Sequence, residues 1–405
     1  TNMGNKNTNI GNTNTKTNIR NTNTKTNIGN TNTNTNMANV EAQRLVDSYS
    51  VDRLNIDLSF HKLTELPDLS RFTQLQKLNC RWNQLTSLPN NLPNSLQELV
   101  CENNQLTSLP DTLPNSLHTL DCRYNKLTSL PDTLPDSLHT LDCGWNQLTT
   151  LPLKLPNSLQ ELKCGWNKLT SLPPNLPNSL LELYCYSNQL TSLPDHLPDS
   201  LQILYCGDNQ LTSLPPNLPD FLKKLYCGNN QLTSLPPKLP NSLERLGCSS
   251  NKLTSLHDLP KSLKELVCSS NKITSLPDIL NSLIELHCNN NKLTSLPNLP
   301  NSLLSFHCLN NQLTSLGPKL PNNLQELFCS HNQLTFFPDL PNSLEYLSYE
   351  KNPKLIKTYP FLKEKEKDTD EDKDKDKEEI EEDYVDYLYG EQLKEIIKKV
   401  NQINK

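Results

Sequence analysis

The sequence predicts a repeat solenoid, an elongated fold in which similar short units stack on one another. One unit, L-x-x-L-x-C-x-x-N-x-L-T-S-L-P-x-x-L-P-x-x, recurs with edits from about residue 51 to residue 353. The thirteen cysteines are spaced by 21 residues eight times, then by 20 residues three times and by 21 once. An asparagine stands three residues after each cysteine. Positions are numbered below from the first leucine of the unit.

Apolar residues at positions 1, 4, 6, 11, 14 and 18 form the expected core. The alternation of Leu78 and Cys80 at positions 4 and 6 predicts a short strand with these side chains pointing inward. Pro89 and Pro93 lack backbone donors, which favours an extended or polyproline-like return path over a helix. Burial of six side chains contributes about 9–18 kcal/mol, whereas fixing one unit costs roughly 20–40 kcal/mol. Stability must therefore be collective, with a parallel β-sheet on the concave face.

The asparagine at position 9 is expected to have an architectural role. The chain must turn where it leaves the strand, and backbone groups there lose their partners in the sheet. An amide offers both donors and an acceptor, so Asn83, Asn104 and their successors can satisfy these groups in a buried row. His61 takes this position in a degenerate first unit, where we interpret it as a tolerated variant and not as a catalyst.

The unit resembles the bacterial-type leucine-rich repeat, a short class found in secreted effectors of enteric bacteria. The resemblance covers roughly residues 51–353 and implies a leucine-rich repeat horseshoe. Cysteine at position 6 and the Asn/Thr-rich leader are more similar to repeat proteins of large amoeba-infecting DNA viruses. Bacterial effectors of this class often carry a ubiquitin-ligase domain with a catalytic cysteine. Here the last cysteine, Cys329, lies within the repeats, which removes that enzymatic implication.

The segments flanking the repeats differ in composition. We expect a disordered Asn/Thr-rich leader over 1–37, a capping helix over 38–52, and a solenoid of about 14–15 repeats over 53–356. A charged acidic linker is expected over 357–390. Apolar spacing over 391–405 predicts an amphipathic helix, whose apolar face docks either on the last repeat or on a partner.

The cysteines are expected to be buried free thiols that pack as small hydrophobic side chains. They share one inward position and are odd in number, and a column of thiols does not converge on a point as metal ligands do. We therefore expect no metal and no cofactor. The sequence contains no apolar run of membrane-spanning length, and its N-terminus lacks the apolar core of a secretory leader. These features favour the cytoplasm, or the host cytoplasm if the protein is viral.

Exposed aromatic residues gather at positions 5, 7 and 8, which should decorate the concave face. Over seven repeat steps they extend roughly 34 Å, at about 4.8 Å per strand. Such residues are enriched at protein interfaces, although the rings could simply cover one another after repeat duplication. Acids beside them, such as Glu98, Glu161 and Glu182, favour a cationic partner segment. We name these residues the aromatic stripe: Trp82, Tyr124, Trp145, Trp166, Tyr184, Tyr186, Tyr205 and Tyr226.

The stripe predicts a monomeric, non-enzymatic scaffold or adaptor that binds a protein partner. The alternative is a carbohydrate-binding surface in which Trp145 and Trp166 form a flat stacking platform. Single-stranded nucleic acid also stacks on aromatic residues, but it requires a positive groove. Asp121 and Asp142 place negative charge there, so neither a nucleic acid nor a membrane is an expected partner.

Catalysis is disfavoured because repeats present a shallow, open surface and not convergent groups in a dry pocket. Two pairs of neighbouring histidines stand out, His118 with His139 and His287 with His307. Each pair is a weak indication of a metal site, and ordinary variation of polar surface residues is the preferred interpretation.

Overall fold

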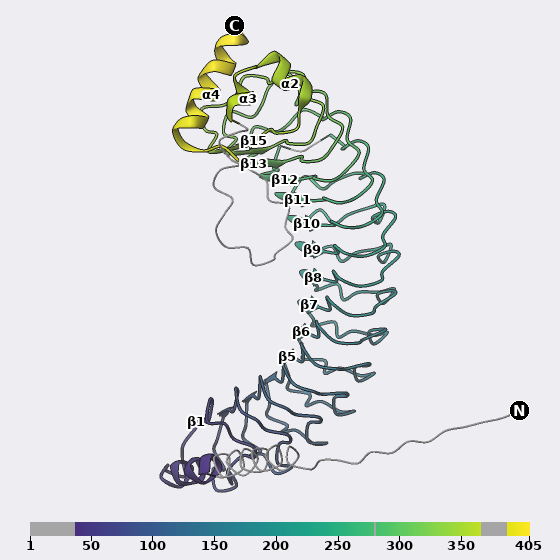
Figure 1. Ribbon diagram of the computed structural model, residues 1–405. Helices are drawn as coiled ribbons and strands as arrows, with labels where there is room; N and C mark the ends of the chain where they lie inside the picture. Colours follow the sequence, from purple (N-terminus) through teal and green to yellow (C-terminus); the bar gives the residue numbers. More distant parts are fainter. Residues whose placement is uncertain (1–36, 279–280, 366–386) are drawn as a thin grey trace, which may run out of the picture.

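The structure, a computed structural model, describes residues 37–278, 281–365 and 387–405 (Figure 1). It is an open arc of stacked coils, in which the strands line the concave side and the return segments form the convex side. The fifteen strands of the described residues form one parallel sheet in chain order, each paired with the next. The predicted leucine-rich repeat solenoid is confirmed. The expected leader and most of the expected acidic linker lie outside the described residues.

Each strand is three residues long and covers positions 3 to 5 of its repeat. The leucine, isoleucine or phenylalanine at the centre of each strand is buried, and these central residues pair in register from one strand to the next. The strands are β1 Asn55–Asp57, β2 Lys77–Asn79, β3 Glu98–Val100, β4 Thr119–Asp121, β5 Thr140–Asp142, β6 Glu161–Lys163, β7 Glu182–Tyr184, β8 Ile203–Tyr205, β9 Lys224–Tyr226, β10 Arg245–Gly247, β11 Glu265–Val267, β12 Glu285–His287, β13 Ser305–His307, β14 Glu326–Phe328 and β15 Tyr346–Ser348.

The core is a continuous row of leucines and cysteines inside the arc. In the repeat that begins at Leu138, the side chains at positions 1, 4, 6 and 11 are 0% exposed. All thirteen thiols are buried and unpaired, as predicted. Burial raises the pKa of Cys80 and of Cys185 to about 12, so these thiols stay protonated at neutral pH. Between β1 and β15 the described residues contain no helix, which agrees with the extended return path.

The asparagine row is a hydrogen-bond ladder that links neighbouring repeats. The Nδ2 group of Asn167 donates to the carbonyl oxygens of Cys143 (3.0 Å) and Cys164 (3.2 Å). Its Oδ1 atom accepts from the backbone N–H of Leu148 in the preceding repeat (2.9 Å). Each asparagine thus serves the repeat before it. The first repeat has no such neighbour to serve, which explains why His61 is tolerated there.

A second ladder, formed by serine at position 21, was not anticipated from the sequence. The hydroxyl of Ser179 donates to the carbonyl oxygen of Leu159, which is position 1 of the same unit and lies one coil back (2.6 Å), and that of Ser95 donates to Leu75 in the same way (2.7 Å). The same contact recurs along the solenoid. Position 21 therefore has a structural role that its polar side chain alone did not reveal.

The N-terminal end is covered by a helix that includes residues 37–47. Its Ala42 and Val46 side chains are buried against the first repeat. Asn39 donates from Nδ2 to the Thr64 hydroxyl (2.8 Å), which fixes the helix to the return segment. This packing covers apolar surface that an open solenoid end would expose.

The C-terminal end is covered by three helices, α2 Pro353–Thr358, α3 Leu362–Lys365 and α4 Gly390–Ile403. The apolar face of α4 is buried, including Ile396 at 1% and Val400 at 0% exposure. Of the two alternatives for this helix, docking on the last repeats is the one observed (Figure 1). Leu388 also pairs with Leu347 in an antiparallel bridge beside β15. Tyr359 is buried as well, so the packed cap continues into the segment that was expected to be linker.

Candidate functional site

Position 8, just beyond the carboxyl end of each strand, adopts a left-handed backbone in every repeat. The φ angle there lies between 50° and 61°, from Phe60 to Lys351. Hydrogen bonds between repeats hold this geometry: Trp145 N–H donates to the Gly165 carbonyl (3.0 Å) and Asn146 N–H to the Trp166 carbonyl (3.2 Å). The left-handed region costs ordinary side chains about 1–2 kcal/mol and is tolerated best by glycine, asparagine and aspartate. Asparagine, aspartate or serine indeed occupies position 8 in eight repeats.

Four large aromatic residues of the stripe nevertheless occupy this position and remain exposed. Trp82 is 48% exposed, Tyr124 41%, Trp145 39% and Trp166 45%. Tyr124 stacks on Trp145 with ring centroids 5.0 Å apart, and Trp145 stacks on Trp166 at 4.1 Å. The indoles point out of the core, as the sequence predicts, and the thiols point into it.

The stacked column has one member that the sequence reasoning missed. Phe60 stacks on Trp82 with centroids 5.6 Å apart and planes 13° from parallel, and it is 62% exposed. It lies at position 8 of the degenerate first repeat, so the register alone could have identified it. Asn103 separates this pair from the Tyr124–Trp145–Trp166 stack.

The tyrosines of the stripe form a separate ladder on β7, β8 and β9. The Tyr184 and Tyr205 rings meet edge to face at 5.0 Å, and the Tyr205 and Tyr226 rings at 4.5 Å. The Tyr184 hydroxyl donates to Glu182 (2.7 Å), and the Tyr226 hydroxyl donates to Glu265 (3.3 Å). These contacts fix the rings on the surface of the sheet.

Tyr186 lies at position 7, between the column of stacked rings and the tyrosine ladder. A Cβ atom added to Gly165 would lie 3.0 Å from the Tyr186 ring, so the ring rests directly over that glycine. The absence of a side chain at Gly165 therefore accommodates the Tyr186 ring. Burial and the nearby Asp142 raise the pKa of the Tyr186 hydroxyl. The stripe is therefore one surface with two packing patterns.

Negative charge surrounds the aromatic residues. Arg123 Nε lies 3.2 Å from a carboxylate oxygen of Asp121, and its terminal nitrogens lie 3.7 Å from Asp142 and 3.4 Å from Glu102. One guanidinium thus forms ion pairs with three carboxylates. Burial, followed by the Asp142 charge, raises the pKa of Asp121 to about 6. The surface would be stabilised by an additional cation.

The ring geometry does not provide the flat platform of the carbohydrate alternative. A sugar stacks on an open aromatic face, but Trp145 has Tyr124 on one face and Trp166 on the other. The two indoles are stacked with planes 12° from parallel and do not lie side by side.

A serine–histidine–glutamate cluster on β13 and β14 does not have the geometry of a catalytic triad. The Ser305 hydroxyl donates to Glu326 (2.6 Å) and lies 3.2 Å from His307 Nε2. Glu326 approaches that same ring nitrogen at 3.4 Å, whereas in a triad it would orient the ring through the other nitrogen. Burial lowers the pKa of His307 to about 4, so the ring is neutral at physiological pH.

The predicted histidine pairs are brought together, but as ring contacts. His287 and His307 stack at 4.0 Å, and His118 and His139 meet edge to face at 5.3 Å. The described part of the chain contains no group of three or more His, Cys, Asp or Glu residues that could hold a metal ion. No helix among the described residues is long and apolar enough to cross a membrane.

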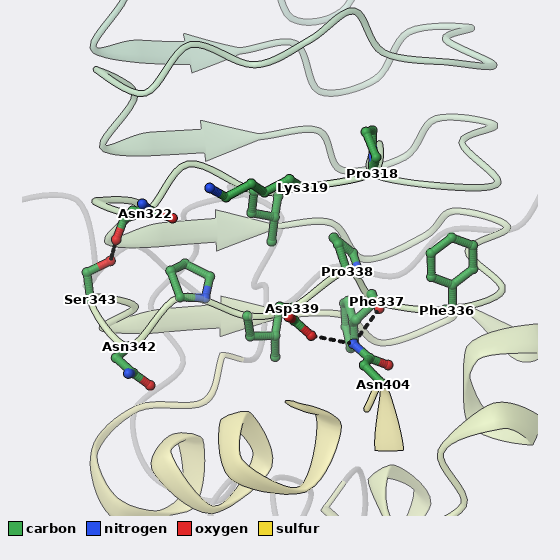
Figure 2. A pocket seen from close by; sticks show the side chains of 13 residues that line it. Pro318, Lys319, Asn322, Phe336, Phe337, Pro338, Asp339, Asn342, Ser343 and Asn404 are labelled. Atoms are coloured by element: carbon green, nitrogen blue, oxygen red, sulfur yellow. Dashed lines mark hydrogen bonds between the residues drawn. The ribbon is translucent and has the colours of Figure 1, made fainter. Parts of the chain in front are cut away.

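A hollow of about 790 Å³ on the return segments of the last repeats is associated with the C-terminal cap (Figure 2). Asn404, at the end of α4, donates from Nδ2 to the Phe337 carbonyl and to Asp339 (both 3.1 Å). Its wall consists of three prolines, two leucines, two phenylalanines, three asparagines and a serine, with Lys319 and Asp339 as its charged members. These contacts attach α4 and do not assemble a catalytic set.

The parallel sheet, the leucine core and the asparagine ladder define the class, and the chain belongs to the leucine-rich-repeat proteins. A sequence profile for Leucine Rich repeats (2 copies) matches residues 199–241 and 220–261. No curated protein sequence matches the chain.

Solved structures place the chain near bacterial proteins. YopM, a leucine-rich effector protein from Yersinia pestis, is 36% identical, with a TM-score of 0.65 over 77% of this chain and 92% of YopM. A leucine-rich-repeat protein from Leptospira interrogans is 29% identical, with a TM-score of 0.67 over 81% of this chain and 96% of that one. The functional domain of InlJ from Listeria monocytogenes, which includes a cysteine ladder, shares the fold at 24% identity and a TM-score of 0.64, over 78% and 72% of the two chains. The bacterial resemblance is confirmed, and the viral one stays a prediction.

Proposed function

We propose that the chain is a non-enzymatic interaction scaffold that binds a protein partner along the aromatic stripe. Leucine-rich-repeat proteins generally mediate protein–protein interactions. The finer proposal, a binding site on the stripe, rests mainly on one observation. Bulky aromatic residues stand exposed at a left-handed backbone position where the same chain elsewhere uses asparagine, aspartate or serine.

The left-handed backbone disfavours bulky side chains, and the arrangement leaves part of the apolar ring surface in water. A residue in a sparsely populated backbone region is often retained for function when a less strained alternative is available. Trp145 could be replaced by asparagine with no change of backbone, because Asn103 and Asn229 adopt the same φ. Exposed tryptophan and tyrosine are the residues that most often anchor a protein partner. The stripe therefore has the composition of an interface.

The proposal also includes the cellular compartment in which the protein acts. The chain acts in the cytoplasm, or in a host cytoplasm if the viral resemblance holds, and it acts as a monomer. Thirteen thiols at buried positions suit a reducing compartment, because none needs a disulfide partner for packing. The bacterial neighbour YopM is itself described as an effector protein.

The test is affinity capture from cytoplasmic extract with a triple variant, Trp145→Ala, Trp166→Ala and Tyr205→Ala. Loss of the anchors is expected to abolish recovery of the partner while far-ultraviolet circular dichroism stays unchanged. The control is the double variant Phe221→Ala and Phe336→Ala, which removes aromatic residues that are 65% and 44% exposed on the return segments. Undiminished recovery with the triple variant would reject the stripe as the binding site.

A further inference from the structure

A hollow of about 330 Å³ lies on the concave sheet near the C-terminal end of the aromatic stripe. Three tyrosine rings and three glycines contribute most of its lining. We name it the tyrosine pocket, and these six residues are Tyr186, Tyr205, Tyr226, Gly207, Gly228 and Gly247. Its size is at the lower end of the range for ligand sites and is sufficient for one side chain of a partner.

The pocket exists because glycines occupy positions 5 and 7 of these repeats. Position 7 carries Arg81, Glu102 and Tyr186 in other repeats, so the backbone there accepts large side chains. Glycine at 207 and 228 leaves that space empty. A Cβ atom on Gly247 would lie 2.5 Å from the Tyr226 ring, so this glycine allows the ring to lie across the sheet. The tyrosine rings thus form the walls of the pocket, and the glycines leave the space between them open.

Two polar groups of the pocket lack a complete set of partners. The Ser249 hydroxyl oxygen is buried and has no hydrogen-bond partner among the described residues. The exposed Asp208 carboxylate accepts one hydrogen bond, from Asn229 Nδ2 at 2.9 Å. A buried hydroxyl without a partner costs about 1–3 kcal/mol. The pocket therefore favours an occupant with several donors.

The charge of the surrounding surface indicates whether that occupant is a cation or an anion. Over β3 to β11, which include the strands under the pocket, the concave positions 3, 5, 7 and 8 carry eight acidic side chains and four basic ones. The acids are Glu98, Glu102, Asp121, Asp142, Glu161, Glu182, Asp208 and Glu265, and the bases are Arg123, Lys163, Lys224 and Arg245, of which Arg245 is paired with Glu265. A cationic, extended segment laid along the sheet would complement this excess.

We propose that the tyrosine pocket binds an arginine side chain from a basic, extended segment of the partner. The inference deepens the proposed function and rests on it. A guanidinium is planar, stacks on tyrosine faces and donates to a carboxylate through two nitrogens, which Asp208 can accept. The proposal directs its remaining N–H groups towards the Ser249 side of the pocket. A phenylalanine or leucine would fill the space but would leave Ser249 unpartnered and the acidic surface uncompensated.

The test uses four blocked, fluorescently labelled peptides in which glycine alternates with arginine, lysine, citrulline or phenylalanine. Fluorescence anisotropy with the full chain is expected to show the tightest binding for the arginine peptide. Gly228→Leu fills the pocket and is expected to weaken this binding at least about tenfold. Asp208→Asn, which keeps the left-handed backbone as Asn229 does, is expected to weaken it roughly tenfold. The matched control, Ser269→Leu, is at position 7 outside the pocket and leaves binding unchanged.

Several results would overturn the pocket assignment. Equal affinity for the lysine peptide would mean that the acidic surface alone is responsible, and tightest binding of the phenylalanine peptide would mean an apolar occupant. Absence of arginine-peptide binding, or no effect of Gly228→Leu and Asp208→Asn, would also reject it. These results are separate from the capture experiment. Loss of capture in the triple variant without arginine selectivity would leave the proposed function in place and remove only the pocket.

Discussion

Replacement of Asn167 by alanine is expected to destabilise the centre of the solenoid by about 2–6 kcal/mol. Leu148 N–H would lose its acceptor at 2.9 Å and become a buried orphan, which costs about 1–3 kcal/mol. The carbonyl oxygens of Cys143 and Cys164 would each lose one donor. Each keeps another, from Asn146 (3.2 Å) and Asn188 (3.0 Å), so each loss costs only about 0.5–1.5 kcal/mol.

Amide hydrogen exchange at Leu148 is the most direct assay, because a long repeat array need not unfold in a single two-state step. A loss of at least about 2 kcal/mol accelerates this exchange about thirtyfold or more. Urea unfolding followed by circular dichroism measures the global effect. The control is Asn178→Ala, which changes an exposed asparagine on the return segment and should cost less than about 0.5 kcal/mol. Unchanged exchange at Leu148 in the Asn167 variant would refute the ladder argument.

Three further predictions concern charge, thiols and the C-terminal cap. The raised pKa of Asp121, about 6, means that its ionisation opposes folding above that pH and has no effect below its unfolded value of 3.8. Asp121→Asn should therefore stabilise the chain against urea at about pH 8 and not at about pH 3, and an equal gain at both would contradict the shift. Ellman's reagent should leave all thirteen thiols unmodified in the native protein and label them in urea; rapid native labelling would show that they are not buried. Val400→Asp should detach α4, lower Tm and accelerate amide exchange at Leu388, and an unchanged Tm would mean that the cap adds no stability.

The repeating elements were predictable because their physical causes are local and periodic. The spacing of cysteine and asparagine fixed the repeat length, and the alternation of Leu78 and Cys80 fixed the strand and its inward face. The amide of Asn83 could be assigned to backbone groups from its chemistry alone. The carboxylates beside the stripe, such as Asp121 and Asp142, also followed from the register.

Features that depend on neighbouring repeats were not predictable from single positions. The left-handed backbone at position 8 arises from contacts between repeats, and Phe60 was missed although it lies in register. Ring directions depend on which neighbour is small, so the role of Gly165 beneath Tyr186 could not be assigned. The apolar face of α4 indicated that a partner surface exists, but only the fold shows that the last repeats supply it.

Site-specific photo-crosslinking tests most directly whether a protein partner lies along the aromatic stripe. Benzoylphenylalanine would replace Ser187, which stands between Trp166 and Asp208 in the column at position 8, or Phe221 on the return segment. Partner crosslinked from 187 and not from 221, through a peptide that contains arginine, is the predicted result. Partner crosslinked from 221 alone would contradict the assignment of the concave stripe as the binding surface.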